Sequence, residues 1–262
     1  MKFRPRFPLA PAAARVVLMG ALGLFGGAFC PAPAAAPREV VNAGQGGDNT
    51  ADMLARLERD VLAHAPEVVV LLAGTNDLLN SRHAVPLEQY RENLHTLAQR
   101  ITATKARLIL LALPPAHAPY LLQRHPAAFY GADGPGSRVT AGNAVIRELA
   151  RERQVPLVDV FAAFAAAGGA SDQANSLLRN TANSGKADGI HPTPAGYRLM
   201  GGLVAEVLIR EDLQAARRIV CLGDSITRGA HVAGEGTATG DTYPAFLLRA
   251  LNEKFPPPPA AP

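Results

Sequence analysis

The sequence is poor in cysteine. Its 262 residues include only Cys30 and Cys221, and Cys30 lies in an N-terminal segment that we expect to be removed. The remaining chain then has a single cysteine and cannot form an internal disulfide bond. Cys221 falls within an apolar run, so we interpret it as a small buried hydrophobic residue rather than as a nucleophile.

Basic residues are in excess only near the N-terminus. The 26 Lys and Arg residues and 22 Asp and Glu residues give a pI of about 9.3, which suggests a nucleic-acid-binding protein. Residues 1–36, however, contain Lys2, Arg4, Arg6 and Arg15 and no acidic residue, so the rest of the chain carries 22 residues of each sign. Without a net positive charge the chain has little to attract a phosphate backbone, and we expect no nucleic-acid partner.

The sequence also lacks internal repeats, heptads and any Cys/His cluster with metal-ligand spacing. Its seven histidines are scattered, and apart from His191 we expect them to be exposed or structural. A nucleotide-binding module is an alternative because of the glycines in 44–47, but this stretch has neither the P-loop lysine nor the Rossmann glycine spacing. The sequence thus contains no motif for a metal or a nucleotide.

Residues 1–36 have the pattern of a secretory signal peptide. A basic start precedes the apolar run Val16–Phe29, and small residues follow it, with cleavage expected after Ala34. The run is short and broken by glycines, which disfavours the alternative of an uncleaved membrane anchor. Lipidation of Cys30 is disfavoured because the residue before it is a bulky phenylalanine. We expect a secreted or periplasmic protein.

Strands and helices alternate along the rest of the chain. Strands are predicted at 39–43, 68–73, 107–113, 156–160 and 219–222. Helices are predicted from Asn49 or Thr50 to Pro66, from Pro86 to Ile101, at 137–153, from Pro194 towards Ala216, and at 243–254. This alternation predicts the α/β class with a parallel sheet, in one domain over 37–255, before a proline-rich tail at 256–262.

Two segments show no periodicity. Residues 116–136 are interpreted as a long surface loop, with a lid over a site as one option. Residues 161–187 are rich in Ala, Gly and Ser and are predicted to be irregular.

A serine follows the last predicted strand in Gly223-Asp224-Ser225. An apolar strand that breaks at a glycine would display the Ser225 hydroxyl in a tight loop at the carboxyl edge of the sheet, where open α/β sheets place their sites. Serines after strands are common, so this interpretation needs a base nearby.

Asp188 and His191 could supply that base. Their separation of three residues lets one turn hold the carboxylate against the imidazole, and Pro192 restricts the backbone of His191. A carboxylate on one ring nitrogen leaves the other free to accept a proton. The alternative is an ordinary loop pair in front of a helix cap.

Two glycine-containing loops could supply donors for an oxyanion. Asn76 offers a side-chain amide, and Gly47 offers a backbone N–H that no side chain obstructs. With the Ser225 N–H they would form a three-donor oxyanion hole. The alternatives are turn geometry for Gly47 and an Asx-turn for Asn76. Asp77 and Asp224 are interpreted as carboxylates that brace their loops.

Together these residues resemble the SGNH hydrolases, also called GDSL esterases/lipases. Four blocks of that family are matched, by Gly223–Thr227, Asn42–Thr50, Gly74–Asp77 and Asp188–Pro192. The resemblance implies a three-layer α/β/α fold with a flavodoxin-like strand order. It also implies hydrolysis of carboxylic esters through an acyl-enzyme, with Ser225 as nucleophile, His191 and Asp188 completing the triad, and Asn76 and Gly47 in the oxyanion hole. The resemblance further implies that no metal and no organic cofactor is needed.

The order of the blocks departs from the family, in which the serine block comes first. Moving residues 218–255 ahead of residue 39 would restore the usual order, so we interpret the chain as circularly permuted. An alternative is a domain that lacks its first block and is followed by the start of a second domain copy. This alternative is less economical, because each block occurs once and the four together make one complete set. A C-terminal segment that swaps into a partner subunit remains open, as does the oligomeric state.

The predicted function is a secreted serine esterase. Export, together with the activities common in the family that the chain resembles, favours removal of short acyl groups, such as acetyl, from carbohydrate esters. A lipase or lysophospholipase is the alternative within the same class, and a wide apolar groove would identify it. A non-catalytic carbohydrate-binding protein on the same scaffold is disfavoured because Ser225, His191 and Asn76 are all present.

Overall fold

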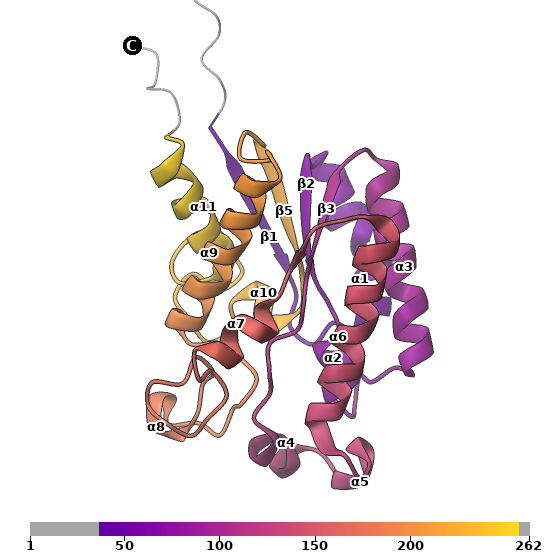
Figure 1. Ribbon diagram of the computed structural model, residues 1–262, viewed down its shortest axis with the longest axis vertical. Helices are drawn as coiled ribbons and strands as arrows, with labels where there is room; N and C mark the ends of the chain where they lie inside the picture. The colour runs from indigo at the N-terminus through magenta and orange to yellow at the C-terminus, as the bar shows by residue number, and fades with distance from the viewer. Residues whose placement is uncertain (1–36, 257–262) are drawn as a thin grey trace, which may run out of the picture. The chain divides into compact units, whose positions relative to one another are not determined.

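The computed structural model describes residues 37–256, and within them five parallel strands form one sheet. The order in the sheet is β1-β5-β2-β3-β4 (Figure 1). The strands are β1 (Glu39–Gly44), β2 (Val68–Leu72), β3 (Arg107–Leu111), β4 (Leu157–Val158) and β5 (Arg218–Gly223). The predicted α/β class with a five-stranded parallel sheet is therefore confirmed. The predicted signal peptide and residues 257–262 of the predicted tail lie outside the described residues.

The last strand of the chain lies inside the sheet. β5 pairs with β1 along one edge, with Ile219 opposite Val40, and with β2 along the other, with Ile219 opposite Val68. Its residues from Ile219 to Gly223 are buried. An uninterrupted apolar run is what a parallel strand needs when helices cover both of its faces.

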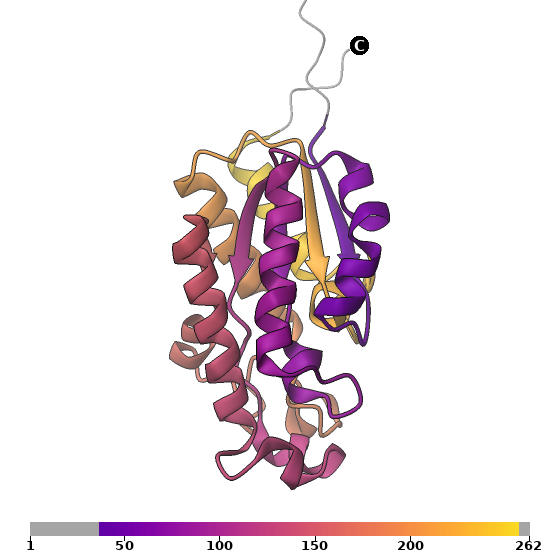
Figure 2. The same ribbon diagram turned by 90° about the vertical axis from the view of Figure 1, so that its right-hand side faces the viewer.

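Helices cover the two faces of the sheet. One face carries α1 (Thr50–Asp60), α3 (Leu87–Ala103) and α6 (Gly134–Arg153), while α9 (Pro194–Arg210) and α11 (Tyr243–Lys254) cover the other (Figures 1 and 2). This is the three-layer α/β/α arrangement that the family resemblance implies. Among the described residues, no helix combines the length and the apolar character that a membrane span requires.

Caps predicted from the sequence fix where several helices begin. Asn49 accepts hydrogen bonds from the backbone of Ala51 and Asp52 and forms a capping box with Asp52. Thr193 accepts from the Gly196 N–H, with Pro194 in the first turn of α9. These side chains satisfy amide groups that the first turn of a helix leaves without partners.

The prediction of a long loop at 116–136 is wrong. This stretch contains α4 (Ala118–Arg124), α5 (Ala127–Tyr130) and the first residues of α6. Pro119 lies in the first turn of α4 and Pro126 is the N-cap of α5, two positions where proline is tolerated. Tyr130 is buried and donates a hydrogen bond to the Leu79 carbonyl at 2.7 Å, a tertiary contact that local sequence does not reveal.

Other boundaries also differ from the prediction. Residues 161–187 are not wholly irregular, because they include most of α7 (Val160–Ala166) and all of α8 (Thr181–Ser184). The strand predicted to reach residue 160 stops at Val158, since Asp159 caps α7. α1 ends at Asp60 and is followed by the 3₁₀ turn η1 (Leu62–His64), and α9 ends at Arg210 rather than continuing towards Ala216.

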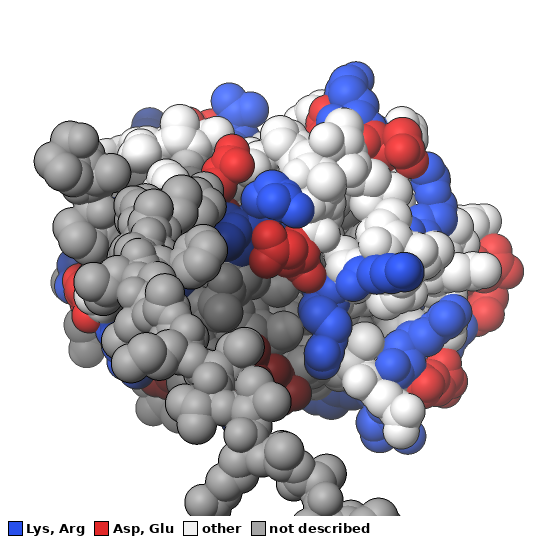
Figure 3. Space-filling model, turned by 90° about the horizontal axis from the view of Figure 1, so that it is seen from above, with Lys and Arg blue, Asp and Glu red and all other residues white. Residues whose placement is uncertain are grey.

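The carboxyl and amino ends of the strands are bordered by different elements. The short helices α2 (Thr75–Leu79) and α10 (Ser225–Arg228) begin directly after the carboxyl ends of β2 and β5, and α4 lies at the same end (Figure 1). The opposite end of the sheet carries both basic and acidic side chains on the face shown in Figure 3. The candidate site residues thus gather at the carboxyl edge.

Candidate active site

Ser225 is the first residue of α10 and follows β5 through a tight turn. Asp224 is the N-cap of α10, and its Oδ1 accepts from the Ile226 N–H at 2.8 Å. A Cβ at position 223 would lie 2.0 Å from Thr227 Oγ1, so only glycine fits there. The turn leaves Ser225 half-buried at the edge of the sheet.

The imidazole of His191 bridges Ser225 and Asp188. Its Nε2 lies 3.0 Å from Ser225 Oγ, and its Nδ1 lies 2.9 Å from Asp188 Oδ2. Asp188 Oδ1 also accepts from the backbone N–H groups of Ile190 and His191. The structure thus brings all three predicted side chains together, in a chain of hydrogen bonds along which the serine proton can move to the ring.

Asp188 is held as a carboxylate. Burial raises its pKa, since its side chain is only 8% exposed, but the hydrogen bonds and charge of His191 and the backbone N–H groups lower it by more. The net result is a pKa well below the ordinary range, so Asp188 stays ionised at neutral pH. An ionised Asp188 accepts from Nδ1–H and leaves Nε2 as the acceptor that faces Ser225.

The three predicted oxyanion donors lie around Ser225. Asn76 is on α2 and lines the same cavity as Ser225 and His191. Its amide donates one hydrogen to the Asp48 carbonyl at 2.9 Å, which ties α2 to the loop that holds Gly47. A Cβ placed on Gly46 would come 4.0 Å from Ser225 Cβ, so this loop borders the serine. Among residues 37–256, the N–H groups of Gly47 and Ser225 have no acceptor.

The orientation of the Asn76 amide is fixed by Asn80. Asn80 Oδ1 accepts from the Arg82 N–H, and Asn80 Nδ2 donates to Asn76 Oδ1 at 3.0 Å. With Asn76 Oδ1 occupied as an acceptor, its Nδ2 faces Asp48 and keeps a second hydrogen free. The sequence analysis did not single out Asn80, which lies one helical turn after Asn76 and reveals its role only through this contact.

The remaining predicted loop residues have structural surroundings. Asp77 accepts from the Thr50 N–H at 3.0 Å and from the Thr50 hydroxyl, which joins α2 to α1. Asp224 caps α10, and burial raises its pKa to about 6. Cys221 is fully buried, and burial raises the pKa of its thiol to about 12. These positions agree with the interpretation of both carboxylates as loop braces and of Cys221 as a core residue.

Two basic side chains that the sequence analysis passed over lie beside Asp188. Arg179 Nε is 3.8 Å from Asp188 Oδ2, and His231 Nε2 is 3.9 Å from the same oxygen. The His231 ring packs edge-on against His191 with 5.0 Å between centroids. Asp188, His191 and His231 also bring ligand atoms within 4.8 Å of one another, but a metal there would compete with the hydrogen bond between Asp188 and His191.

A small cavity opens next to Ser225, with a volume of about 100 Å³. Apolar residues Leu79, Leu121 and Ile190 form part of its wall, and Arg124 and His125 stand on the α4 side. The segment predicted as a surface loop therefore borders the site, through α4. Neither Arg124 nor His125 was a predicted site residue, because their approach to Ser225 depends on how α4 folds.

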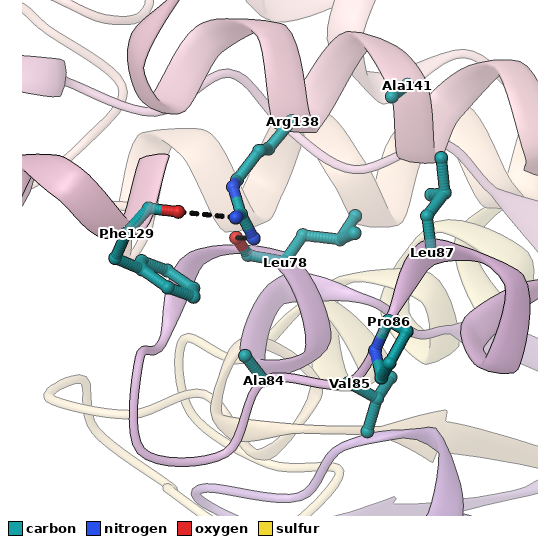
Figure 4. Close-up of a pocket in the computed structure, with 8 residues that line it drawn as sticks. All are labelled: Leu78, Ala84, Val85, Pro86, Leu87, Phe129, Arg138 and Ala141. Atoms are coloured by element: carbon teal, nitrogen blue, oxygen red, sulfur yellow. Dashed lines mark hydrogen bonds between the residues drawn. The ribbon is translucent and has the colours of Figure 1, made fainter. Parts of the chain in front are cut away.

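A larger cavity of about 350 Å³ lies elsewhere, between α2, the start of α3 and α6 (Figure 4). Its wall is mainly apolar, and Arg138 crosses it to donate a hydrogen bond to the Phe129 carbonyl. It shares no lining residue with the cavity at Ser225. Leu78 faces this cavity while Asn76 faces the site, because residues two apart point to different sides of a helix.

Comparison with known proteins gives one family and several relatives. The model of the GDSL-like lipase/acylhydrolase family matches residues 24–199. An uncharacterized lipoprotein of Bacillus subtilis, YqeF, is 29% identical over 174 residues, which cover 62% of this chain and 70% of that protein. An acetylxylan esterase of Geobacillus stearothermophilus is 27% identical over 175 residues, which cover 66% of this chain and 71% of the esterase.

Solved structures resemble the chain as well. A presumed acylhydrolase from Bacteroides fragilis aligns with a TM-score of 0.51 and 26% identity, over 64% of this chain and 73% of that one. The residues matched by the family model end at 199, before β5 and Ser225.

Proposed function

The chain belongs to the GDSL-like lipase/acylhydrolase family and is a carboxylic ester hydrolase, and we propose that Ser225, His191 and Asp188 are its catalytic triad. The observation that carries this proposal is the pair of contacts made by one imidazole, 3.0 Å to Ser225 Oγ and 2.9 Å to Asp188 Oδ2. Both distances are those of ordinary hydrogen bonds, and they place nucleophile, base and orienting acid in the order that serine catalysis needs.

In the first half of the reaction Ser225 Oγ attacks the ester carbonyl carbon while His191 Nε2 takes its proton. The carbonyl oxygen becomes an oxyanion, which the N–H groups of Ser225 and Gly47 and the free amide hydrogen of Asn76 stabilise. When the C–O bond to the alcohol breaks, the imidazolium returns the proton to the leaving oxygen. The product is an acyl group bound to Ser225 and a free alcohol.

In the second half a water molecule replaces the alcohol. His191 removes a proton from the water, whose oxygen attacks the acyl carbon, and then protonates Ser225 Oγ as the acid leaves. Asp188 remains ionised throughout and stabilises the imidazolium by accepting from Nδ1–H. In both halves of the reaction the catalytic groups are side chains and backbone groups of the chain, and water is the only other reactant besides the ester.

The proposed substrate is a short acyl ester, such as an acetyl group on a carbohydrate. The cavity at Ser225 is small, and the larger apolar cavity does not join it, which favours a short acyl group over a fatty acyl chain. The relative from Geobacillus stearothermophilus is an acetylxylan esterase, and this too supports a carbohydrate ester. A lipase or lysophospholipase is the second candidate, since the family includes lipases by name.

The chain order is proposed to be a circular permutation of the family's usual order. β5 carries the nucleophile and lies between β1 and β2, although it follows all the other strands in sequence. The family model matches a stretch that ends before this strand. Both observations fit a chain whose first block has moved to its end.

We also propose that residues 1–36 are a signal peptide, that residues 37–255 are a single hydrolase domain, and that the protein is secreted or periplasmic. The basic start and apolar run of the sequence support the signal peptide. The Bacillus subtilis relative is a lipoprotein, which agrees with export.

The experiment that tests the triad is labelling with a fluorophosphonate probe. The wild-type protein should be labelled and Ser225→Ala should not, and Ser225→Ala should lower kcat on 4-nitrophenyl acetate by about 10³-fold or more. Thr227→Ser, which keeps a hydroxyl two residues away, serves as the folded control. A wild-type protein that neither reacts with the probe nor hydrolyses short aryl esters would overturn the proposal. A series of acyl chain lengths then decides between acetyl esterase and lipase.

A further inference from the structure

Arg124 stands at the mouth of the Ser225 cavity without an acidic partner. It is the last residue of α4, its side chain is exposed, and it lines the cavity together with Ser225 and His191. One guanidinium nitrogen donates to the carbonyl of Asp188, which anchors the side chain beside the triad. Its Nε and Nη1 groups make no hydrogen bond to any of residues 37–256, so they remain available to a ligand.

A second arginine, Arg82, is adjacent in sequence to Ser81, whose hydroxyl lies 2.9 Å from Nδ1 of His125. Arg82 follows α2 and is also exposed, and no carboxylate of the described chain lies within 4.0 Å of either Arg82 or Arg124. His125 is affected by both charges. Burial lowers its pKa first, and the charges of Arg124 and Arg82 lower it further, with no acidic group opposing them. The α4 side of the cavity mouth is therefore positive and uncompensated.

The carboxylate of Asp188 does not pair with Arg124. Asp188 turns its side chain towards His191, Arg179 and the backbone N–H groups, and offers Arg124 only its carbonyl oxygen. An exposed cation at the mouth of a cavity attracts an anion and orients it before binding, and a second cation nearby strengthens the attraction. A guanidinium pairs with the two oxygens of a carboxylate through Nη2 and either Nε or Nη1. Nη2 of Arg124 uses only one of its two hydrogens for the Asp188 carbonyl, so its other hydrogen and those of Nε and Nη1 remain for an anion.

The size of the cavity indicates which part of the substrate meets Arg124. A cavity of about 100 Å³ has room for the acyl group of a short ester. The acyl group of a short ester fills that space next to Asn76 and Leu79. With the acyl group in this space, the alcohol part would project towards the exposed side of Arg124.

We propose that the natural ester carries a carboxylate on its alcohol part and that Arg124 binds this carboxylate, with Arg82 increasing the attraction. An acylated acidic sugar has this chemistry. The inference rests on the proposed esterase function and narrows its substrate class from neutral to anionic alcohols. Arg124 is then a specificity-determining residue, since it contacts the substrate away from the reacting carbonyl.

The experiment compares two matched substrates, acetylated glucuronic acid and acetylated glucuronamide, which differ by one charge. The wild-type enzyme should have a kcat/KM about 10-fold or more higher for the acid. In Arg124→Gln that ratio should fall by about 10-fold or more, towards equal kcat/KM values for the two substrates, as expected when a charged hydrogen-bonded pair is lost. Arg124→Lys should keep part of the ratio, and added salt should reduce the wild-type ratio because exposed charges are screened.

An acetylated sugar phosphate tests whether a phosphate serves as well as a carboxylate, and a stronger preference for it would replace the carboxylate in the proposal.

Arg153→Gln is the matched control. Arg153 is exposed and ends α6, far from its start beside α4 and α5, so its loss should leave both substrates and their ratio unchanged. Equal wild-type kcat/KM values for the acid and the amide would overturn the proposal. So would an Arg124→Gln variant that slows both substrates by the same factor, which would mean that Arg124 only supports the Asp188 loop. If neither substrate nor 4-nitrophenyl acetate is hydrolysed and the fluorophosphonate does not label Ser225, the esterase function fails instead.

Discussion

Arg38 donates a hydrogen bond from its guanidinium to the side chain of Asn252 at 2.7 Å, across 214 residues of sequence. The same guanidinium donates to the carbonyls of Gln214 and Ala216, in the connection between α9 and β5. The beginning of β1, the end of α11 and the loop before β5 therefore meet at one end of the sheet. Circular permutation requires this arrangement. The backbone could be cut in the loop before β5, and the start of β1 could be linked to the end of α11 over a short distance.

The first prediction is that a relinked chain folds and is active. Residues 38 and 255 are joined by a linker of roughly six Gly and Ser residues, and the chain is opened after Asp212, which is exposed in a turn with a positive φ. In the relinked chain β5 is the first strand. Gln214 and Ala216 remain in the segment before β5, so they can still accept the hydrogen bonds from Arg38. We expect kcat/KM on 4-nitrophenyl acetate within about 10-fold of the original, since no site residue is moved. An insoluble product would argue against permutation as the origin of the present order.

The second prediction concerns the loss of β5. Deleting residues 218–262 removes the strand between β1 and β2 and exposes edges that are buried against it. Because sheet and core both depend on this strand, the truncated chain should be unfolded or aggregate, as measured by circular dichroism and size-exclusion chromatography. Deleting only residues 257–262 is the control and should leave a folded, active enzyme. A soluble and compact truncated chain would show that β5 is not needed for folding.

The third prediction is that Ser225 and His191 act within one chain. Their 3.0 Å contact forms inside a single chain, without a swapped segment. When Ser225→Ala and His191→Ala proteins are unfolded, mixed and refolded together, esterase activity should stay at the level of the separate variants. Restored activity would instead reveal a site shared between two subunits, which the sequence alone left open.

The sequence predicted those parts of the site that depend on local spacing. Asp188 and His191 lie three residues apart, so one turn brings them together. Gly223 and Ser225 mark the end of an apolar strand, and the carboxyl edge of a parallel sheet collects such ends. The α/β class could be predicted from the alternation of strands and helices along the chain, because the helix caps and apolar runs that mark these elements are local signals.

The sequence could not predict the parts that depend on tertiary contacts. α4 and α5 are short, with Pro119 in the first turn of α4 and Pro126 at the N-cap of α5, and burial of Tyr130 and Leu121 against the rest of the molecule stabilises them. Arg124 reaches the site only because α4 folds there. His231 reaches Asp188 only through the loop after α10, which no periodic pattern describes.

The fourth prediction is that Asn80 positions the oxyanion donor Asn76. In Asn80→Asp a carboxylate oxygen replaces the amide that donates to Asn76 Oδ1, so the Asn76 amide should turn and lose its orientation towards the oxyanion. We expect kcat to fall by about 10²-fold with little change in KM, comparable to the loss of one oxyanion donor. Asn80→Ala, which removes the donor without adding a repelling acceptor, should have a smaller effect.

A double-mutant cycle separates positioning from a general structural defect. If Asn80 acts through Asn76, adding Asn80→Asp to Asn76→Ala should cause little further loss of kcat. Independent effects that multiply in the double variant would contradict this role.

The fifth prediction concerns the pH dependence of stability through Asp224. Burial raises the pKa of this carboxyl from its ordinary value of 3.8 to about 6, so the folded protein favours the protonated form. Its contribution to stability is therefore fully present below about pH 4 and is lost as the pH rises through 6. The Asp224→Asn substitution keeps an oxygen for the Ile226 N–H but introduces no charge, so this variant should not lose stability over that range.

The unfolding free energy of Asp224→Asn relative to wild type should therefore increase by up to roughly 3 kcal/mol between about pH 4 and 7, measured by urea denaturation at each pH. Asp212→Asn, at an exposed turn, is the control and should show no such increase. A flat difference for Asp224→Asn would mean that Asp224 is already ionised in the folded protein at the acidic end of this range.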